Sequence, residues 1–237
     1  MLLGRIFKSR DPDNRRSIFW MEALAEFVLV VVGILLALQI DNWNQERQDR
    51  RLERVLLNEM LSNLQSDLSD VEFNISLDED YLRSARIVID YLESERGYHD
   101  SLSAHFGCLD IGTLFMANTS SFESMESIGI DLVRNDSLRQ QITYLYSATY
   151  NFVRELEDIL ANLTINRMHI QLSLNVRPDN LNHRASPLDP IGIKRNNEFY
   201  SAVIYRTRMT EIQLQSYRDV SLQIRTLIHD IEKELEK

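Results

Sequence analysis

The sequence predicts an all-α protein, in which an N-terminal transmembrane helix continues into a long stalk helix and an antiparallel helical bundle. Three observations predict this class. Glycine (7) and proline (4) are scarce among the 237 residues, whereas average usage gives roughly 12% for the two together. Residues 27–38 read FVLVVVGILLAL, without one polar side chain. Apolar residues then recur at alternating four- and three-residue steps from Leu57 to Leu92.

The composition argues against several functional classes. The 36 acidic and 26 basic residues give a net charge of −10, which argues against nucleic-acid binding because that needs a clustered basic surface. One cysteine, Cys108, excludes an intrachain disulfide framework. His105, Cys108 and Asp110 are close in sequence, but a closed zinc site needs about four ligands. No nucleophile-elbow, phosphate-loop or dinucleotide motif occurs, so we expect no enzyme, cofactor or metal.

The apolar stretch has the length of a membrane span. From Trp20 to Trp43 a helix covers about 34 Å, which matches a hydrocarbon core of roughly 30 Å with an aromatic anchor at each interface. A buried core helix is the alternative for a strict apolar run of this length. A cleaved signal peptide fits less well, because no A-x-A site follows the run. We therefore divide the chain into a leader (1–20), a transmembrane helix (21–43) and an extramembrane domain (44–237).

The basic residues favour a cytoplasmic N-terminus, by a small margin. Five precede the apolar stretch: Arg5, Lys8, Arg10, Arg15 and Arg16. Four follow it closely: Arg47, Arg50, Arg51 and Arg54. This orientation predicts that residues 44–237 are periplasmic. Residues 41–237 contain 21 basic and 32 acidic residues, a net charge of −11, so this domain is repelled by anionic lipid.

The anchor also resembles a bacterial family of uncharacterised small single-pass membrane proteins. Two segments match its patterns, AEFVLVVVGILLALQIDNWNQER and SSFESMESIGIDLVRNDSLRQQI. The matching positions of the first segment are Glu26, Val30, Val31, Gly33, Ile34, Ala37, Leu38, Ile40, Asn42, Trp43 and Asn44. Asp41 and Gln45 depart mildly from the pattern. The resemblance implies the bacterial inner membrane and this architecture, and it implies no activity or catalytic residue.

Residues 44–237 are predicted to form three long helices and one short helix. The first continues from the anchor to about Gly97, and the short helix covers residues 121–127 and ends at Gly129. The next helix begins after an N-cap at Asn135 or Asp136, and the last runs from about residue 197 to residue 236. Loops are expected near residues 97–119 and 178–195. The expected buried positions of the middle helix are Leu138, Ile142, Leu145, Thr149, Phe152, Leu156, Ile159 and Leu163.

One polar residue interrupts the apolar seam of the first helix. Asp78 occupies a position of the seam at which the other ten residues are apolar. A polar residue in such a seam can fix the register of packing. Local exposure to solvent explains the same residue equally well.

Four residues of the membrane helix share one face and predict a helix–helix interface. Glu22, Glu26, Gly33 and Ala37 are separated by steps of four and seven residues, and small residues at such spacing allow close helix approach. A carboxylate at membrane depth usually faces a partner. The alternative places Glu26 at the cytoplasmic headgroup level, with Gly33 merely tolerated. We therefore expect a lipid bilayer and a second copy of the chain as partners.

The predicted function is a membrane-anchored, self-associating helical protein with a periplasmic interaction or sensing role. A different class is a ligand-binding sensor or an enzyme that uses a cleft near residues 97–119, and a third is a small oligomeric channel involving Glu26. The sequence identifies no protein partner. In a periplasmic domain the unpaired Cys108 is also a candidate for an intermolecular disulfide.

Overall fold

The computed structural model describes residues 12–179 and 183–237, with side chains from residue 24 onward. Helices make up most of this part, which confirms the predicted all-α class. The described chain forms two compact units, Met1–Leu52 and Glu53–Lys237. The longest helix, α1 (Pro12–Glu93), contributes to both units.

In the first unit, α1 exposes its apolar side chains. From Leu24 the helix is long and apolar enough to cross a membrane by length and composition, and its most apolar stretch is not buried by any other part of the described chain. No proline interrupts α1 after Pro12, and a proline at the first helical position removes no helical hydrogen bond. The helix ends at Glu93, so the predicted end near Gly97 is four residues late.

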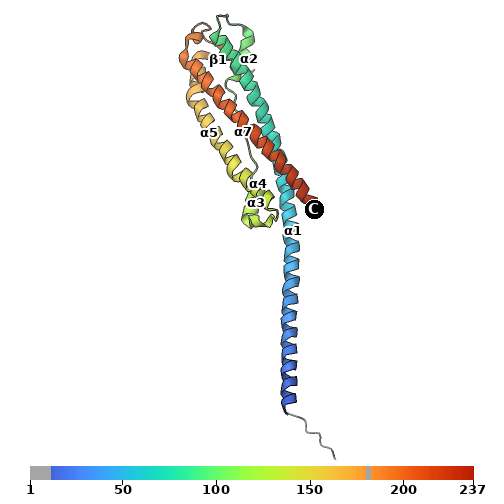
Figure 1. The fold of residues 1–237 in the computed structure, drawn as a ribbon. Coiled ribbons are helices and arrows are strands. Elements are labelled where there is room, and N and C mark those ends of the chain that lie inside the picture. The colour runs from blue at the N-terminus through green and yellow to red at the C-terminus, as the bar shows by residue number, and fades with distance from the viewer. Residues whose placement is uncertain (1–11, 180–182) are drawn as a thin grey trace, which may run out of the picture. The chain divides into compact units, whose positions relative to one another are not determined.

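In the second unit, three long helical segments pack together (Figure 1). The first is α1 from residue 53 onward. The second is a nearly continuous run of α4 (Asp136–Tyr144), a π-turn (Leu145–Thr149), α5 (Tyr150–Leu163), a second π-turn (Thr164–Met168) and α6 (His169–Asn175). The third is α7 (Asn197–Leu235). Asn135 caps α4 by accepting a hydrogen bond from the Leu138 N–H, as predicted, and Asn196 caps α7 in the same way.

Contacts between the helices give their directions. Ion pairs join Glu79 to Arg218 at 2.7 Å and Arg86 to Glu211 at 3.1 Å, so α1 and α7 are antiparallel. The Glu53 carboxylate accepts a hydrogen bond from the Arg134 N–H. Further along both segments, the Asp67 carboxylate accepts a hydrogen bond from the Tyr150 hydroxyl. The run from α4 to α6 is therefore parallel to α1. The chain must return along the bundle between these two parallel segments.

The return is made by the segment between α1 and α4, in which residues 97–119 were predicted to be irregular and residues 121–127 to form a short helix. It contains a 3₁₀ turn (Asp100–Leu102), the six-residue α2 (Ser103–Cys108) and α3 (Ser120–Ile128). Residues 111–119 belong to no helix or strand. α3 ends at Gly129 as predicted, and the φ of +124° at this residue is accessible to glycine alone at little cost. A further 3₁₀ turn (Ile130–Leu132) precedes α4.

The π-turn at Leu145–Thr149 makes part of the predicted seam wrong. A π-turn inserts one residue into the helix and shifts every later position on its face by one. Phe152 and Ile159, predicted to be buried, are 58% and 52% exposed, whereas Tyr150, Val153 and Leu160 are buried in their place. A prediction that assumes constant spacing between buried residues does not include this one-residue shift.

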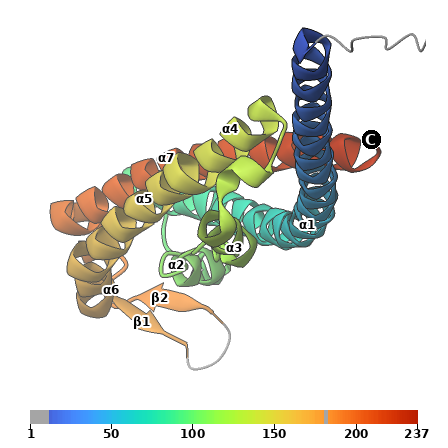
Figure 2. The ribbon, with the colours of Figure 1, turned by 90° about the horizontal axis from the view of Figure 1, so that it is seen from below.

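The second predicted loop contains a small β-hairpin. The antiparallel strands β1 (Val176–Pro178) and β2 (Ala185–Pro187) pair with Val176 opposite Pro187. Figure 2 shows the hairpin beside α2 and α6, and β2 contacts α2. A 3₁₀ turn (Gly192–Arg195) then leads into α7. The hairpin was not predicted.

The interior of the second unit consists of two apolar clusters with a polar layer between them. The first cluster includes Leu57, Leu64, Val71, Phe115, Ile142, Tyr150, Val220, Ile224 and Ile231. The second includes Tyr81, Ala85, Val88, Phe106, Leu109, Phe199, Val203 and Leu214. The polar layer is defined by Asn74, Asp78, Glu157, Arg206, Thr210 and Gln213, all of them buried. Buried charges are uncommon unless they are paired or functional, so this layer is the first candidate for a functional site.

Candidate functional site

The predicted interface of the membrane helix is exposed. Glu26, Gly33, Ala37 and Trp43 all lie on the exposed surface of α1. A Cβ atom added at Gly33 would meet no atom within 4 Å, so this face has space for a second helix. Trp20 and Glu22 belong to α1, but their side chains lie outside the described residues.

A strap, defined as residues 113–118, is bound to α1 by polar side chains. The Asp70 carboxylate accepts a hydrogen bond from the Met116 N–H at 2.9 Å, and the Asp67 carboxylate accepts one from the Asn118 N–H at 2.8 Å. The Asn74 amide donates to the Leu114 carbonyl at 3.0 Å. The acids and amides of α1 therefore replace the strand partner that an extended backbone normally has.

The strap also contacts the opposite side of the bundle. The Glu157 carboxylate of α5 accepts a hydrogen bond from the Phe115 N–H at 2.8 Å. The Phe115 side chain is buried and packs edge-on against Tyr150, with the ring centroids 5.1 Å apart. Its neighbours Leu114 and Met116 are 62% and 75% exposed. Alternate side chains thus point inward and outward, as in an extended chain.

Asp78 is buried in the polar layer, so the explanation by local exposure to solvent is wrong. The side chain is 2% exposed, and its Oδ1 accepts a hydrogen bond from the Thr113 hydroxyl at 2.9 Å. Its Oδ2 is buried and has no hydrogen-bond partner among the described residues. Burial raises the pKa of Asp78 to about 6, the Thr113 hydroxyl and the positive charge of Arg206 lower it, and the negative charge of Glu157 adds to the rise.

Arg206 supplies the positive charge of this layer. Its guanidinium donates to the Thr164 hydroxyl and to the Ile111 carbonyl, the latter at 2.7 Å. It also lies over the ring of Tyr81 at 5.1 Å, a distance at which a cation is attracted to an aromatic face. The side chain is 4% exposed, and its Nε has no partner within the described chain. Arg206 therefore balances one of the two nearby carboxylates, Asp78 and Glu157.

Glu157 and Tyr217 form a short hydrogen bond across the bundle. The Tyr217 hydroxyl donates to Glu157 Oε1 at 2.5 Å and receives a hydrogen bond from the Gln213 amide at 2.9 Å. Burial raises the pKa of Glu157, although the contacts with Tyr217 and the Phe115 N–H lower it. Burial, together with the Glu157 contact, also raises the pKa of the Tyr217 hydroxyl.

Asp67 repeats this pattern inside the first apolar cluster. Its side chain is 1% exposed, and its Oδ2 accepts a hydrogen bond from the Tyr150 hydroxyl at 2.8 Å. Burial raises the pKa of Asp67 to about 6, although the hydrogen bonds from Asn118 and Tyr150 oppose the rise. Such carboxyl groups gain and lose protons close to neutral pH, which an ordinary aspartate does not.

The cleft predicted near residues 97–119 is present at the hairpin end of the bundle. It has a volume of about 770 Å³, and its lining includes residues of α2, α6 and the hairpin. Phe106, Ile111 and Leu172 contribute apolar surface to it. At its rim, Asp110 Oδ1 and His169 Nε2 are 2.6 Å apart. A cleft with an apolar lining and an acid–histidine pair can accept a small amphipathic molecule.

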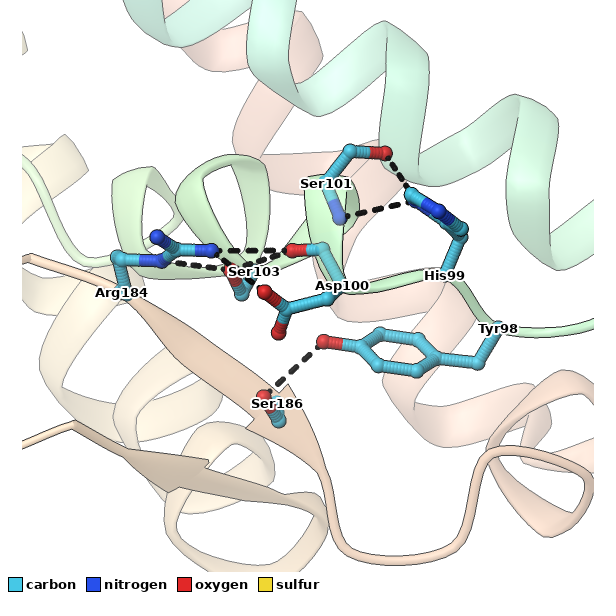
Figure 3. Close-up of polar contacts among 7 residues, drawn as sticks. All are labelled: Tyr98, His99, Asp100, Ser101, Ser103, Arg184 and Ser186. Atoms are coloured by element: carbon cyan, nitrogen blue, oxygen red, sulfur yellow. Dashed lines mark hydrogen bonds and ion pairs between the residues drawn. The ribbon is translucent and has the colours of Figure 1, made fainter.

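Polar contacts attach the hairpin to α2 beside this cleft (Figure 3). The Arg184 guanidinium donates to the Ser103 hydroxyl at 2.8 Å and to the Asp100 carboxylate at 3.0 Å. The Tyr98 hydroxyl donates to Ser186 at 3.0 Å. Figure 3 also shows His99, whose Nδ1 accepts a hydrogen bond from the Ser101 N–H at 3.2 Å and thereby caps the 3₁₀ turn. Of these residues, Arg184 also lines the cleft.

The histidine and cysteine residues near α2 do not gather into a metal site in the described structure. No group of three or more His, Cys, Asp or Glu side chains in residues 12–179 and 183–237 is placed to hold a metal ion. Cys108 is half-buried and unpaired. His105 instead contacts the Ser84 hydroxyl at 3.2 Å. Asp110 pairs with His169, a contact that the sequence did not predict.

Sequence reasoning identified Asp78 in this region and missed the other buried charges. A second series of α1 residues at seven-residue steps is also buried: Glu53, Met60, Asp67 and Asn74. The helix therefore has a second buried face beside the apolar seam. In α7, no apolar residue is buried between Val203 and Leu214. Arg206, Thr210 and Gln213 fill this interval and are buried.

The family comparison covers most of these elements. Residues 26–167 match the model of a family described as "Family of unknown function (DUF6090)". The match includes α1 from Glu26, the strap and α5. No curated protein and no solved structure matches the chain. Because the match covers more than half of the 237 residues, the chain belongs to the DUF6090 family.

Proposed function

We propose that this protein is a bacterial inner-membrane protein, anchored by α1, which self-associates and presents its helical bundle in the periplasm for interaction or sensing. The observation that supports the anchor best is the exposure of α1 in the first unit. Twelve large apolar side chains between residues 24 and 40 are 36–73% exposed. Exposed apolar surface of this extent is unfavourable in water, and a lipid bilayer removes the cost.

Membrane insertion is tested by alkaline extraction of membranes that contain the full-length chain. An integral protein remains in the pellet, whereas a peripheral protein is released. The orientation is tested by protease treatment of intact and opened cells, with detection of the C-terminus. We expect cleavage of the bundle as soon as the outer membrane is permeable. Protection until the inner membrane is opened would overturn the periplasmic orientation.

Self-association is supported by the small residues on one face of α1. Gly33 and Ala37 leave space for close approach of two helices. The test is the mass of the purified protein in mild detergent, with G33L/A37L as the variant and V31L, on a different face, as the matched control. We expect an oligomer that G33L/A37L dissociates and V31L preserves. A monomeric wild-type protein, or an oligomer unaffected by G33L/A37L, would exclude this interface.

A ligand-binding role of the cleft is the second candidate. Its support is the volume of about 770 Å³ and the combination of apolar lining with the Asp110–His169 pair at the rim. Native mass spectrometry of the gently purified protein tests it. A bound small molecule that is lost in L172W, a variant that fills the cleft, would support a ligand-binding sensor. A ligand-free spectrum of the wild-type protein would count against it.

A further inference from the structure

We propose that the bundle is a proton sensor, in which closing of the strap on α1 is coupled to proton binding by Asp67 and Asp78. The strap connects the two acids, because Asn118 contacts Asp67 at one end and Thr113 contacts Asp78 at the other. This inference concerns the second unit alone and does not depend on membrane insertion or self-association.

The attachment of the strap is mainly polar. Phe115 is its one fully buried large apolar side chain, whereas Leu114 and Met116 are mostly exposed. Three backbone N–H groups of the strap, at residues 115, 116 and 118, donate to carboxylates. On its outer side the strap lines a groove of about 640 Å³ that reaches Tyr150 and Glu157. Opening of the strap therefore removes Phe115 and the partly buried Ala117 from the first apolar cluster and admits water to the acids.

Asp67 is surrounded by groups that cannot neutralise its charge. The strap contributes the Asn118 N–H, and the π-turn and α5 contribute the hydroxyl-bearing Tyr146 and Tyr150. On its own helix, Asp70 adds a second negative charge. No cation faces Asp67 among these contacts, so the proton is the available source of positive charge.

Asp78 is surrounded by one cation and one further acid. The strap contributes the Thr113 hydroxyl, α5 contributes Glu157, and α7 contributes Arg206. Tyr81 lies one turn further along α1, where its ring faces Arg206. With Asp78 and Glu157 both ionised, the buried layer has a net negative charge. Proton uptake by Asp78 leaves a neutral layer.

The direction of the coupling follows from linkage. In the closed state the pKa of Asp67 and that of Asp78 are about 6, above their ordinary value of 3.8. Opening removes the hydrogen bonds from the Asn118 N–H and the Thr113 hydroxyl, which lower these pKa values, but it also admits water. Because burial is the largest cause of the rise, the net effect of opening is to return both pKa values toward the ordinary value. The closed state therefore binds protons more tightly than the open state. Closing is favoured at low pH and is lost progressively as the pH rises from about 4 to about 6.

Hydrogen exchange of the full-length chain in detergent tests this coupling. Peptides that cover residues 113–118 are followed at pH 5 and pH 7.5, and each rate is divided by the intrinsic exchange rate at that pH. We expect the protection of these amides to be greater at pH 5, by about tenfold for each coupled carboxyl group. Equal protection at the two pH values would overturn the proposal.

Two variants and a matched control make the test specific. D67N and D78N replace each acid by a neutral side chain of the same shape, so each variant should lose about tenfold of the pH effect and keep a closed strap at pH 7.5. D70N removes a half-buried acid that contacts the same strap and should retain most of the pH effect, because the charge of Asp70 is the smallest of the causes that raise the pKa of Asp67. Retention of the full effect in D67N and D78N, or its loss in D70N, would contradict the assignment. Circular dichroism of each variant confirms the helical fold before exchange is measured.

Discussion

The two parts of α1 show opposite patterns of burial. Between residues 24 and 40 the helix exposes valine, leucine and phenylalanine, whereas between residues 53 and 93 it buries three acids: Glu53, Asp67 and Asp78. Exposed apolar side chains need a binding partner from outside the chain, such as lipid or a second copy of the protein. Buried acids need hydrogen-bond donors from inside it, and the strap provides several of these. One continuous helix therefore has two parts whose side chains require different surroundings.

The largest expected effect is on the first part of the helix. Two arginines near the centre of the span, in V31R/L35R, should abolish membrane insertion, because each costs about 2.5–3.5 kcal/mol at that depth. The chain should appear in the alkaline supernatant or be degraded. V31L/L35V, which preserves apolar character, is the control. A V31R/L35R chain that stays in the membrane pellet would show that residues 24–40 are not the anchor.

Phe115 tests the apolar part of the strap attachment. Truncation of this buried ring in F115A should lower the free energy of unfolding by about 3 kcal/mol. The same truncation at the exposed neighbour, M116A, should change it by less than about 0.5 kcal/mol. Denaturant titration of the detergent-solubilised chain measures both. Similar effects of the two variants would mean that the strap does not bury Phe115.

Substitution of Arg206 tests the charge balance of the polar layer. R206M leaves Asp78 and Glu157 without their cation and should destabilise the bundle by about 3 kcal/mol at pH 7.5. The loss should be smaller at pH 5, where Asp78 binds a proton. R208M, at an exposed position of the same helix, should be nearly neutral at both pH values. A loss in R206M that is independent of pH would remove the electrostatic explanation.

Substitutions that test the π-turn should give the smallest changes in the free energy of unfolding. V153A removes a side chain that is 2% exposed and should cost about 2 kcal/mol, whereas F152A, at 58% exposure, should cost less than about 1 kcal/mol. The continuous seam predicted from the sequence gives the opposite order. Denaturant midpoints of the two variants therefore distinguish the two registers.

The sequence predicted the features that local patterns encode. The scarcity of glycine and proline predicted long helices, the spacing of apolar residues predicted the buried side of α1, and the N-cap of α4 is Asn135, one of the two residues predicted for it. The C-terminal helix was predicted to within one residue of Asn197–Leu235 at each end. All of these depend on residues close together in the sequence.

The strap and the polar layer depend on contacts between distant residues. Asp67 meets Tyr150, 83 positions away, and Glu157 meets Tyr217, 60 positions away. An acid on a helix of an acidic protein usually faces water, so nothing local distinguishes these carboxylates from the exposed ones. The π-turn likewise has no local marker, and it moved Phe152 out of the core.

The pH dependence of stability tests the account most directly. Denaturant titration of the full-length chain at pH 5 and pH 7.5 measures the free energy of unfolding at each pH. Because Asp67 and Asp78 bind protons more tightly in the folded state, the wild-type protein should be less stable at pH 7.5, by about 3 kcal/mol. The D67N/D78N double variant should lose most of this difference. A wild-type stability that is constant or rises between pH 5 and pH 7.5 would contradict burial of ionisable acids along α1.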